Sequence, residues 1–255
     1  MDKIEQENIV KKGNNSQQIV GAIIIAGVLI AGAILLRGNL SQKFVNNSND
    51  GIPLKTLTPV NKDDRMLGNA KAKVTIILYE DFQCPFCGAV SGLASDIDAI
   101  KYLKKIDPNW TPFMLTINEY IKNGDVNFVY RDWAFLGTES TKSAEAARCA
   151  SLQGKFWEYH DYLYAHQNGE NKGGFSDINL KAFAKNLNLN TTTFNQCFDS
   201  GKYTQAITDA KNEGTSAGIT GTPKGFILKD NKFVGTIDGA ESGTTVKQKI
   251  DAALK

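Results

Sequence analysis

The sequence predicts a mixed α/β domain that follows one hydrophobic segment long enough to span a membrane. An uncharged apolar run occupies Ile19–Leu36, and β-rich runs flank a helical stretch in the first part of the remaining chain. Two further β-rich runs and a helix close the chain, after a long block with helical periodicity. The net charge of +2 over 255 residues, without a basic stripe, gives no reason to expect a nucleic-acid partner.

The segment Ile19–Leu36 is expected to be an uncleaved transmembrane anchor, preceded by a short tail at 1–18. As a helix it would extend roughly 27 Å, about the thickness of the hydrocarbon core. Ala31-Gly32-Ala33 has the A-x-A spacing of a cleavage site, so a signal peptide stays open as the alternative. The Asn- and Ser-rich stretch 37–65 is predicted to be a flexible linker.

The folded domain is expected to cover 66–255. Its first half should begin with a buried strand at Val74–Tyr79, followed by a helix that runs to about Lys105. After breaks at Pro108 and Pro112, a further helix should end at Asn123, and a second strand should follow at Asp125–Tyr130. Apolar residues at helical spacing predict a helical insertion over about 138–218. A hairpin around Asp230-Asn231 and a final helix over Val246–Leu254 should follow.

The motif Cys84-Pro85-Phe86-Cys87 follows the first strand and opens the helix. In such a setting C-x-x-C is a redox signature, because the free N–H groups at a helix N-terminus stabilise a thiolate, and thiolate is the species that attacks disulfides. Pro85 suits the first helical turn, where an N–H is not needed. A zinc half-site and two inert core cysteines are the alternatives. Zinc would need two more ligands, and since no second C-x-x-C or nearby histidine pair is present, we expect no metal.

Three segments together resemble the DsbA-like thioredoxin-fold oxidoreductases: Lys73–Cys87 (KVTIILYEDFQCPFC), Gly154–Asp161 (GKFWEYHD) and Gly221-Thr222-Pro223. The resemblance extends from about Leu67 to the C-terminus. It implies a thioredoxin fold with an inserted helical subdomain. It also implies that Thr222-Pro223 is a cis-proline loop against the C-x-x-C, where the backbone before the proline pairs with an extended substrate. From the residues alone, a plain turn with a trans proline is the alternative.

The sequence also departs from this family. The buried acidic residue that the family often carries six positions before the first cysteine is replaced by Leu78, and Glu80 and Asp81 lie closer to the motif. The dipeptide Pro85-Phe86 lacks the histidine of the strongest oxidants in the family, so we expect a milder oxidant. Groove residues near Phe82 and Phe86 are expected to offer apolar surface to substrates.

Two cysteines and both histidines lie in the helical block. Cys149 and Cys197 sit among apolar neighbours, and we expect a structural disulfide, with two buried free thiols as the alternative. His160 and His166 fall close together, and for His160 a packed or capping role is favoured over a catalytic one.

The resemblance implies an extracytoplasmic protein dithiol oxidase. A substrate thiolate would attack Cys84, and Cys87 would be the resolving cysteine. Unfolded or reduced proteins are the expected substrates, a quinone-linked membrane protein is the expected oxidant, and no cofactor is implied. The domain is expected on the outer side of the cell membrane, held by its single span, because the cytosol keeps thiols reduced. A reductase or isomerase of the same fold, and a membrane-tethered binding or chaperone module with structural cysteines, remain as alternatives.

Overall fold

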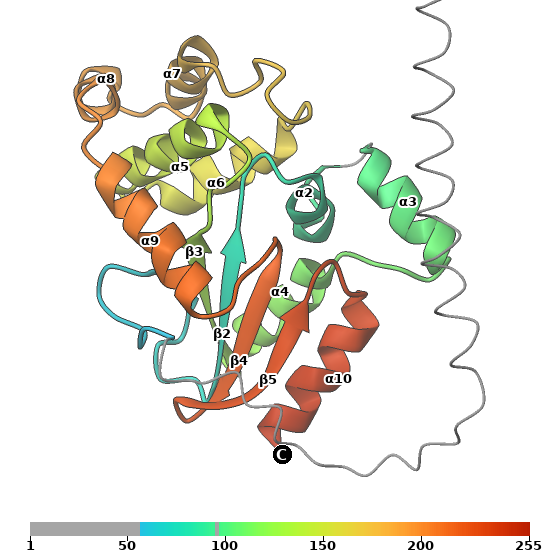
Figure 1. Ribbon diagram of the computed structural model, residues 1–255. Helices are drawn as coiled ribbons and strands as arrows, with labels where there is room; N and C mark the ends of the chain where they lie inside the picture. The colour runs from blue at the N-terminus through green and yellow to red at the C-terminus, as the bar shows by residue number, and fades with distance from the viewer. Residues whose placement is uncertain (1–56, 95–96) are drawn as a thin grey trace, which may run out of the picture. The chain divides into compact units, whose positions relative to one another are not determined.

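A five-stranded mixed sheet forms the centre of the computed structural model, which describes residues 57–94 and 97–255 (Figure 1). The strand order is β1-β3-β2-β4-β5. β2 runs parallel to β3, and the other neighbouring pairs are antiparallel. The strands are β1 (Arg65–Gly68), β2 (Val74–Glu80), β3 (Val126–Asp132), β4 (Lys224–Lys229) and β5 (Lys232–Asp238).

The central strand β2 is buried along its whole length because the sheet is covered on both faces. Side chains alternate between the faces of a strand. Ile76 and Leu78 therefore join the core shared with α4 (Phe113–Asn123) and α10 (Gly243–Leu254). Tyr79 lies on the opposite face with Trp133, against α9 (Thr204–Ser216). Figure 1 shows α9 on one side of the sheet and α4 and α10 on the other.

A helical insertion follows β3 and returns the chain to β4. Its helices are α5 (Thr138–Ser151), α6 (Phe156–Ala165), α7 (Asp177–Asn186), α8 (Thr191–Asp199) and α9. These bounds agree with the insertion predicted over about 138–218. Cys149 of α5 and Cys197 of α8 form a disulfide, with their Cα atoms 5.8 Å apart. Of the two arrangements that the sequence left open for this pair, the disulfide is the one that the structure contains.

The helix expected from the C-x-x-C motif to about Lys105 is two helices, α2 (Pro85–Ser91) and α3 (Asp98–Ile106). The prediction of one continuous helix is wrong because Gly92 ends α2 in the left-handed conformation, with φ of 75°. Glycine adopts this conformation without a steric penalty, and it is a common helix terminator. The hairpin at Asp230-Asn231 is confirmed, with φ of 49° and 62° at its two turn residues.

No helix within residues 57–94 and 97–255 is long and apolar enough to cross a membrane. The anchor expected at Ile19–Leu36 lies outside these described residues.

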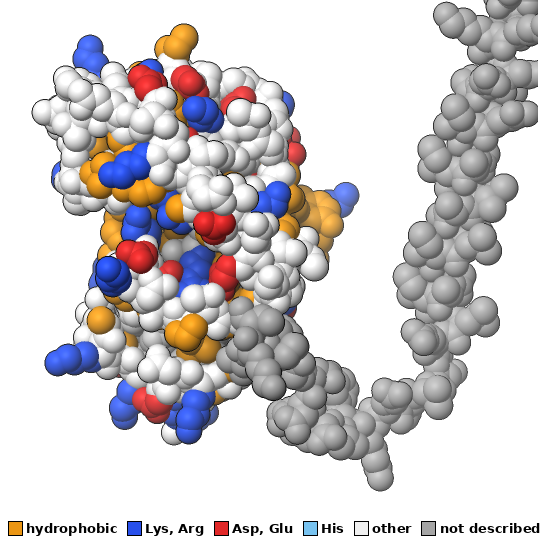
Figure 2. Space-filling view, turned by 60° about the vertical axis from the view of Figure 1, so that its left-hand side comes forward, with side chains coloured by type: hydrophobic (Ala, Val, Ile, Leu, Met, Phe, Trp, Pro, Cys, Tyr) orange, Lys and Arg blue, Asp and Glu red, His pale blue; other side chains and the backbone are white. Residues whose placement is uncertain are grey.

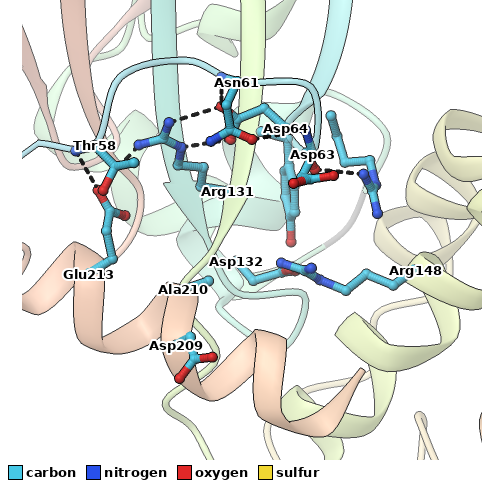
Figure 3. Close-up of a pocket in the computed structure, with 12 residues that line it drawn as sticks. Thr58, Asn61, Asp63, Asp64, Arg131, Asp132, Arg148, Asp209, Ala210 and Glu213 are labelled. Atoms are coloured by element: carbon cyan, nitrogen blue, oxygen red, sulfur yellow. Dashed lines mark hydrogen bonds and ion pairs between the residues drawn. The ribbon is translucent and has the colours of Figure 1, made fainter. Parts of the chain in front are cut away.

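The end of the expected linker belongs to the folded domain. On the face seen in Figure 2, charged side chains gather in a hollow. Figure 3 shows the residues that line a cavity of about 230 Å³ there, between the segment 58–65, β3 and α9. The Arg131 guanidinium donates to both carboxylate oxygens of Asp64, at 2.8 and 2.9 Å, and to Glu213 of α9 at 3.2 Å. The side chains of Arg131 and Asp64 are only 5% and 8% exposed. The linker boundary predicted at residue 65 is therefore too late, because a polar stretch is fixed by an arginine distant in sequence.

Replacing Asp64 with alanine should lower the free energy of unfolding by about 3 kcal/mol, because it leaves the buried Arg131 charge without its bidentate partner. Urea unfolding of the full chain in detergent, followed by far-UV circular dichroism, measures the change. Asp63→Ala is the matched control and should change stability by less than about 0.5 kcal/mol, since that side chain is exposed. Equal losses for the two variants would show that the Arg131 pair does not fix this segment.

Candidate active site

The first cysteine of the motif occupies the N-terminus of α2. Cys84 is the residue that precedes the helix, with extended backbone angles, and Pro85 stands in the first turn as the sequence predicted. The Cys84 carbonyl accepts the N–H of Gly88 at 3.0 Å. The thiol therefore lies where the unpaired backbone N–H groups and the positive end of the helix dipole favour negative charge.

The loop expected to face the motif does so. The peptide bond between Thr222 and Pro223 is cis. The Cys84 thiol donates a hydrogen bond to the Thr222 carbonyl, with sulfur and oxygen 3.4 Å apart. The fold thus brings residues 138 positions apart in sequence into direct contact.

The two cysteines differ in exposure and in acidity. Cys84 retains 4% of its surface and Cys87 none. The hydrogen bond from Cys87 is the main cause that lowers the pKa of Cys84 below the ordinary thiol value. Burial opposes it, and the Thr222 side chain and the backbone N–H groups of Cys87 and Phe86 lower the pKa further. Burial raises the pKa of Cys87 well above that value, and Cys84 and the charge of Glu80 raise it further. Thiolate is therefore favoured at Cys84 and thiol at Cys87.

A buried carboxylate fixes the turn that leads into the motif. Asp81 accepts the N–H of Gln83 at 2.8 Å, and also the N–H groups of Phe135 and Leu136 at 2.8 and 3.1 Å. It therefore ties the loop after β2 to the loop after β3. Gln83 is also buried, and it bonds Ser140 and the backbone N–H of Asn171 in the helical insertion.

Gln167, a residue that the sequence did not single out, covers the other side of the motif. Its side-chain amide donates to the carbonyls of Phe82 and Cys84, at 2.6 and 2.9 Å. A Cβ at Gly88 would lie 2.3 Å from the Gln167 side-chain oxygen, so a larger residue in α2 would displace the Gln167 amide from its present position. No local pattern marks Gln167, because its partners are more than 80 positions away.

Glu80 is the acidic residue buried beneath the motif. Leu78 and Glu80 are two positions apart in β2, and residues at that spacing share one face of a strand. Glu80 therefore points into the core that contains Cys87, although it is two residues beyond the position where the family often has its acid. Burial raises the pKa of Glu80, and contact with His160 opposes that rise.

An open cavity of about 640 Å³ lies beside the motif. It is lined on one side by apolar residues of α2 and α3, including Phe86 and Tyr102, and on the other by the polar segment Gln167–Glu170. Phe86 thus offers apolar surface, as predicted. Phe82 does not, because it is 1% exposed and packs on Tyr130 and Tyr164 in the core.

The His160 ring is packed in the core, where it is buried among aromatic rings that include Tyr130, Trp157 and Tyr164. His166 is exposed and stacks on Tyr162. Within the described part of the chain, no group of three or more His, Cys, Asp or Glu residues is placed to hold a metal ion.

Relatives of two kinds are similar in sequence. A protein of Bacillus cereus named as a probable disulfide bond formation protein D is 20% identical over 214 residues, which cover 80% of this chain and 88% of that protein. An Na(+)/H(+) antiporter NhaA 1 of Salinispora arenicola is 29% identical over 177 residues, which cover 67% of this chain but 22% of that protein. The chain therefore spans about a quarter of the length of the antiporters that it matches.

Solved structures of DsbA-like proteins share the fold. α-DsbA1 of Wolbachia pipientis superposes with a TM-score of 0.61 at 22% identity, over 78% of this chain and 94% of that one. Oxidised BdbD of Bacillus subtilis gives a TM-score of 0.60 at 20% identity, over 77% of this chain and 95% of that one. The predicted thioredoxin-like α/β fold with a helical insertion is therefore confirmed.

A family model described as Thioredoxin matches residues 60–102 and 112–252, which include the C-x-x-C motif and the cis-proline loop. Its match covers most of the chain. The chain therefore belongs to the thioredoxin family.

Proposed function

We propose that this chain is a protein thiol–disulfide oxidoreductase that forms disulfides in reduced substrates outside the cytoplasm, with Cys84 as the nucleophilic cysteine and Cys87 as the resolving cysteine. The observation that carries the proposal is the position of the Cys84 thiol, at the N-terminus of α2 and in contact with the Thr222 carbonyl, directly beside the buried Cys87. The similarity to the probable disulfide bond formation protein of Bacillus cereus supports it.

The chemistry follows from the difference between the two cysteines. A substrate thiolate attacks Cys84 of the Cys84–Cys87 disulfide and forms a mixed disulfide, while Cys87 leaves and takes up a proton. A second substrate thiolate then attacks the substrate sulfur of the mixed disulfide and releases Cys84 as thiolate. Two substrate thiols thereby lose two electrons, and the Cys84–Cys87 pair gains them. Stabilising the Cys84 thiolate favours the reduced form of the pair and makes it the better oxidant.

Two features beside Cys84 suit a polypeptide substrate. The backbone of Thr222 can pair with an extended segment as a sheet edge does, which selects for chain conformation rather than for sequence. The cavity between Phe86, Tyr102 and the segment Gln167–Glu170 offers apolar surface beside a polar rim. Apolar surface favours unfolded chains, whose hydrophobic side chains are accessible.

The proposal also includes the location of the domain and the protein that reoxidises its cysteine pair. The apolar segment Ile19–Leu36 would hold the domain on the outer side of the cell membrane. The Cys149–Cys197 disulfide supports an oxidising compartment. A quinone-linked membrane protein would accept the two electrons from the reduced pair and return it to the disulfide.

Alkylation of the reduced full chain should distinguish the two cysteines. The rate of Cys84 alkylation by iodoacetamide should follow thiolate formation, with a midpoint below the ordinary thiol pKa of about 8.5, while Cys87 stays unmodified in the folded protein. Mass spectrometry of peptides after reaction at a series of pH values measures both rates.

The variant Cys87→Ala tests the cause of that acidity. It removes the hydrogen bond that contributes most to lowering the pKa of Cys84, so the midpoint should move upward. An unchanged midpoint would assign the acidity to the helix N-terminus and the Thr222 side chain instead. Equal alkylation of Cys84 and Cys87 in the parent chain would contradict the proposed roles.

Catalysed oxidation of a reduced, unfolded test substrate examines the function itself. The full chain in detergent, with glutathione disulfide as the terminal oxidant, should speed the appearance of disulfides in that substrate. Cys84→Ser should reduce the rate to the uncatalysed background. Cys87→Ser should accumulate a covalent adduct between Cys84 and a test substrate that has a single cysteine, because neither Cys87 nor a second substrate thiol is then present to release Cys84.

The double variant Cys149→Ser/Cys197→Ser is the matched control, because it removes two cysteines outside the site. Its folded fraction should retain the parent activity. Faster reduction than oxidation by the parent chain would favour a reductase or isomerase. A parent chain without exchange activity would favour the alternative of a membrane-tethered binding or chaperone module with structural cysteines.

A further inference from the structure

Buried polar atoms cluster at the carboxyl ends of β2 and β3, close to the redox pair. Four side-chain atoms there are buried and have no hydrogen-bond partner among the described residues: Glu80 Oε1, His160 Nε2, Tyr130 Oη and Tyr164 Oη. The rings of Tyr130 and Tyr164 lie with their centroids 5.3 and 4.9 Å from that of His160. Buried polar groups nearly always have partners, so a cluster of atoms outside hydrogen-bond distance of any partner calls for an explanation, and a role in proton transfer is one.

His160 connects this cluster to the protein surface. Its Nε2 atom lies 4.0 Å from the Glu80 carboxylate, a separation that a small side-chain movement closes. Its Nδ1 atom lies 2.9 Å from Oδ1 of Asp161, whose side chain is 58% exposed. The enclosing aromatic rings hold the imidazole with one nitrogen facing inward and the other facing the surface.

The proposed exchange chemistry requires proton movement at Cys87. This thiol has no exposed surface, so water cannot reach it directly. Yet it must gain a proton when the Cys84–Cys87 disulfide opens and lose one when the disulfide forms. Glu80 is near enough for its charge to raise the pKa of Cys87, and it is buried on the same side of the sheet.

We propose that His160 relays protons between Glu80 and Asp161, so that Cys87 exchanges protons with solvent through a path inside the domain. The inference rests on the proposed function. When the disulfide forms, Cys87 gives its proton to the Glu80 carboxylate, and the resulting thiolate attacks the Cys84 sulfur of the mixed disulfide. The substrate leaves as thiolate. Glu80 then passes its proton to Nε2 of His160, and Nδ1 releases one to solvent beside Asp161. When the disulfide opens, the same path supplies the proton to Cys87.

The acidities in the cluster agree with this path. Burial raises the pKa of Glu80, so this carboxyl holds a proton more readily than an exposed one. Burial lowers the pKa of His160, but the hydrogen bond with Asp161 and the contact with Glu80 outweigh it, and the net shift is upward. The other titratable groups near the path are Cys87 of α2, Tyr130 of β3 and Tyr164 of α6, and burial raises the pKa of all three. Asp132, ion-paired with Arg148, lies beyond Tyr130.

Stopped-flow reaction of the reduced full chain in detergent with glutathione disulfide separates the two chemical steps. Attack by the Cys84 thiolate is second order and depends on glutathione disulfide concentration. Attack by Cys87 on the mixed disulfide is first order and limits the rate at high concentration. His160→Gln should slow only the first-order step, by about tenfold, since a positioned proton-transfer group typically contributes at least that much. Its rate should also become more strongly dependent on pH.

His166→Gln is the matched control, because it removes the only other histidine, which is exposed, and it should leave both steps unchanged. Asp161→Asn should slow the first-order step less than His160→Gln and keep the fold, because the Asp161 side chain is largely exposed. If His160→Gln does not fold, two other measurements test the relay: the first-order rate of Asp161→Asn, and an NMR titration of His160 in the parent chain. A relay requires that the midpoint of His160 differ between the oxidised and reduced chains.

A folded His160→Gln variant with the parent first-order rate and pH profile would overturn the relay, as would a slower rate with an unchanged pH profile, which marks a packing role. A parent chain whose Cys84 does not react with glutathione disulfide would instead overturn the proposed function.

Discussion

The geometry of the site depends on the hydrogen bonds that the buried carboxylate of Asp81 accepts. It accepts three backbone N–H groups, one from the turn before Cys84 and two from the loop after β3. Burial raises the pKa of Asp81, and these hydrogen bonds oppose that rise. Because β2 and β3 are parallel neighbours, their carboxyl ends meet at one edge of the sheet, and Asp81 joins the two loops that leave it. The start of α2, and with it Cys84, is thereby fixed relative to the helical insertion.

From that position the two cysteines acquire opposite properties. Cys84 stands at the helix N-terminus against the cis-proline loop, where thiolate is favoured, while Cys87 lies one turn further along in the core, where thiol is favoured. The same arrangement that excludes Cys87 from substrate also excludes it from solvent. Burial keeps the Cys87 thiol from exchanging protons with solvent directly, and the proposed path through Glu80 and His160 restores that exchange. The packing of the core is thereby linked to the rate of disulfide exchange.

Much of this site could be predicted from the sequence because its signals are local. C-x-x-C after a strand, Thr222-Pro223 before a hairpin, and the strand and helix periods each lie within a short window. No motif identifies Glu80 as the buried acid beside Cys87, because the position where the family often has its acid holds Leu78. Only the two-residue period of β2 shows that Leu78 and Glu80 point to the same face of the strand. Gln167, Asp64 and the short edge strand β1 depend on partners distant in sequence, so local patterns could not identify them. The split between α2 and α3 depends on the conformation of Gly92, which a glycine permits but does not require.

The central claim is that Cys84 and Cys87 form an exchanging redox pair poised to oxidise other proteins. The most direct test is the reduction potential of the pair, obtained by equilibrating the full chain in glutathione buffers and trapping free thiols, with Cys84→Ser to assign the signal. A pair that oxidises other proteins should have a potential between about −120 and −180 mV, the range of DsbA and protein disulfide isomerase. A potential near the thioredoxin value of about −270 mV, or a pair that never exchanges with glutathione, would contradict it.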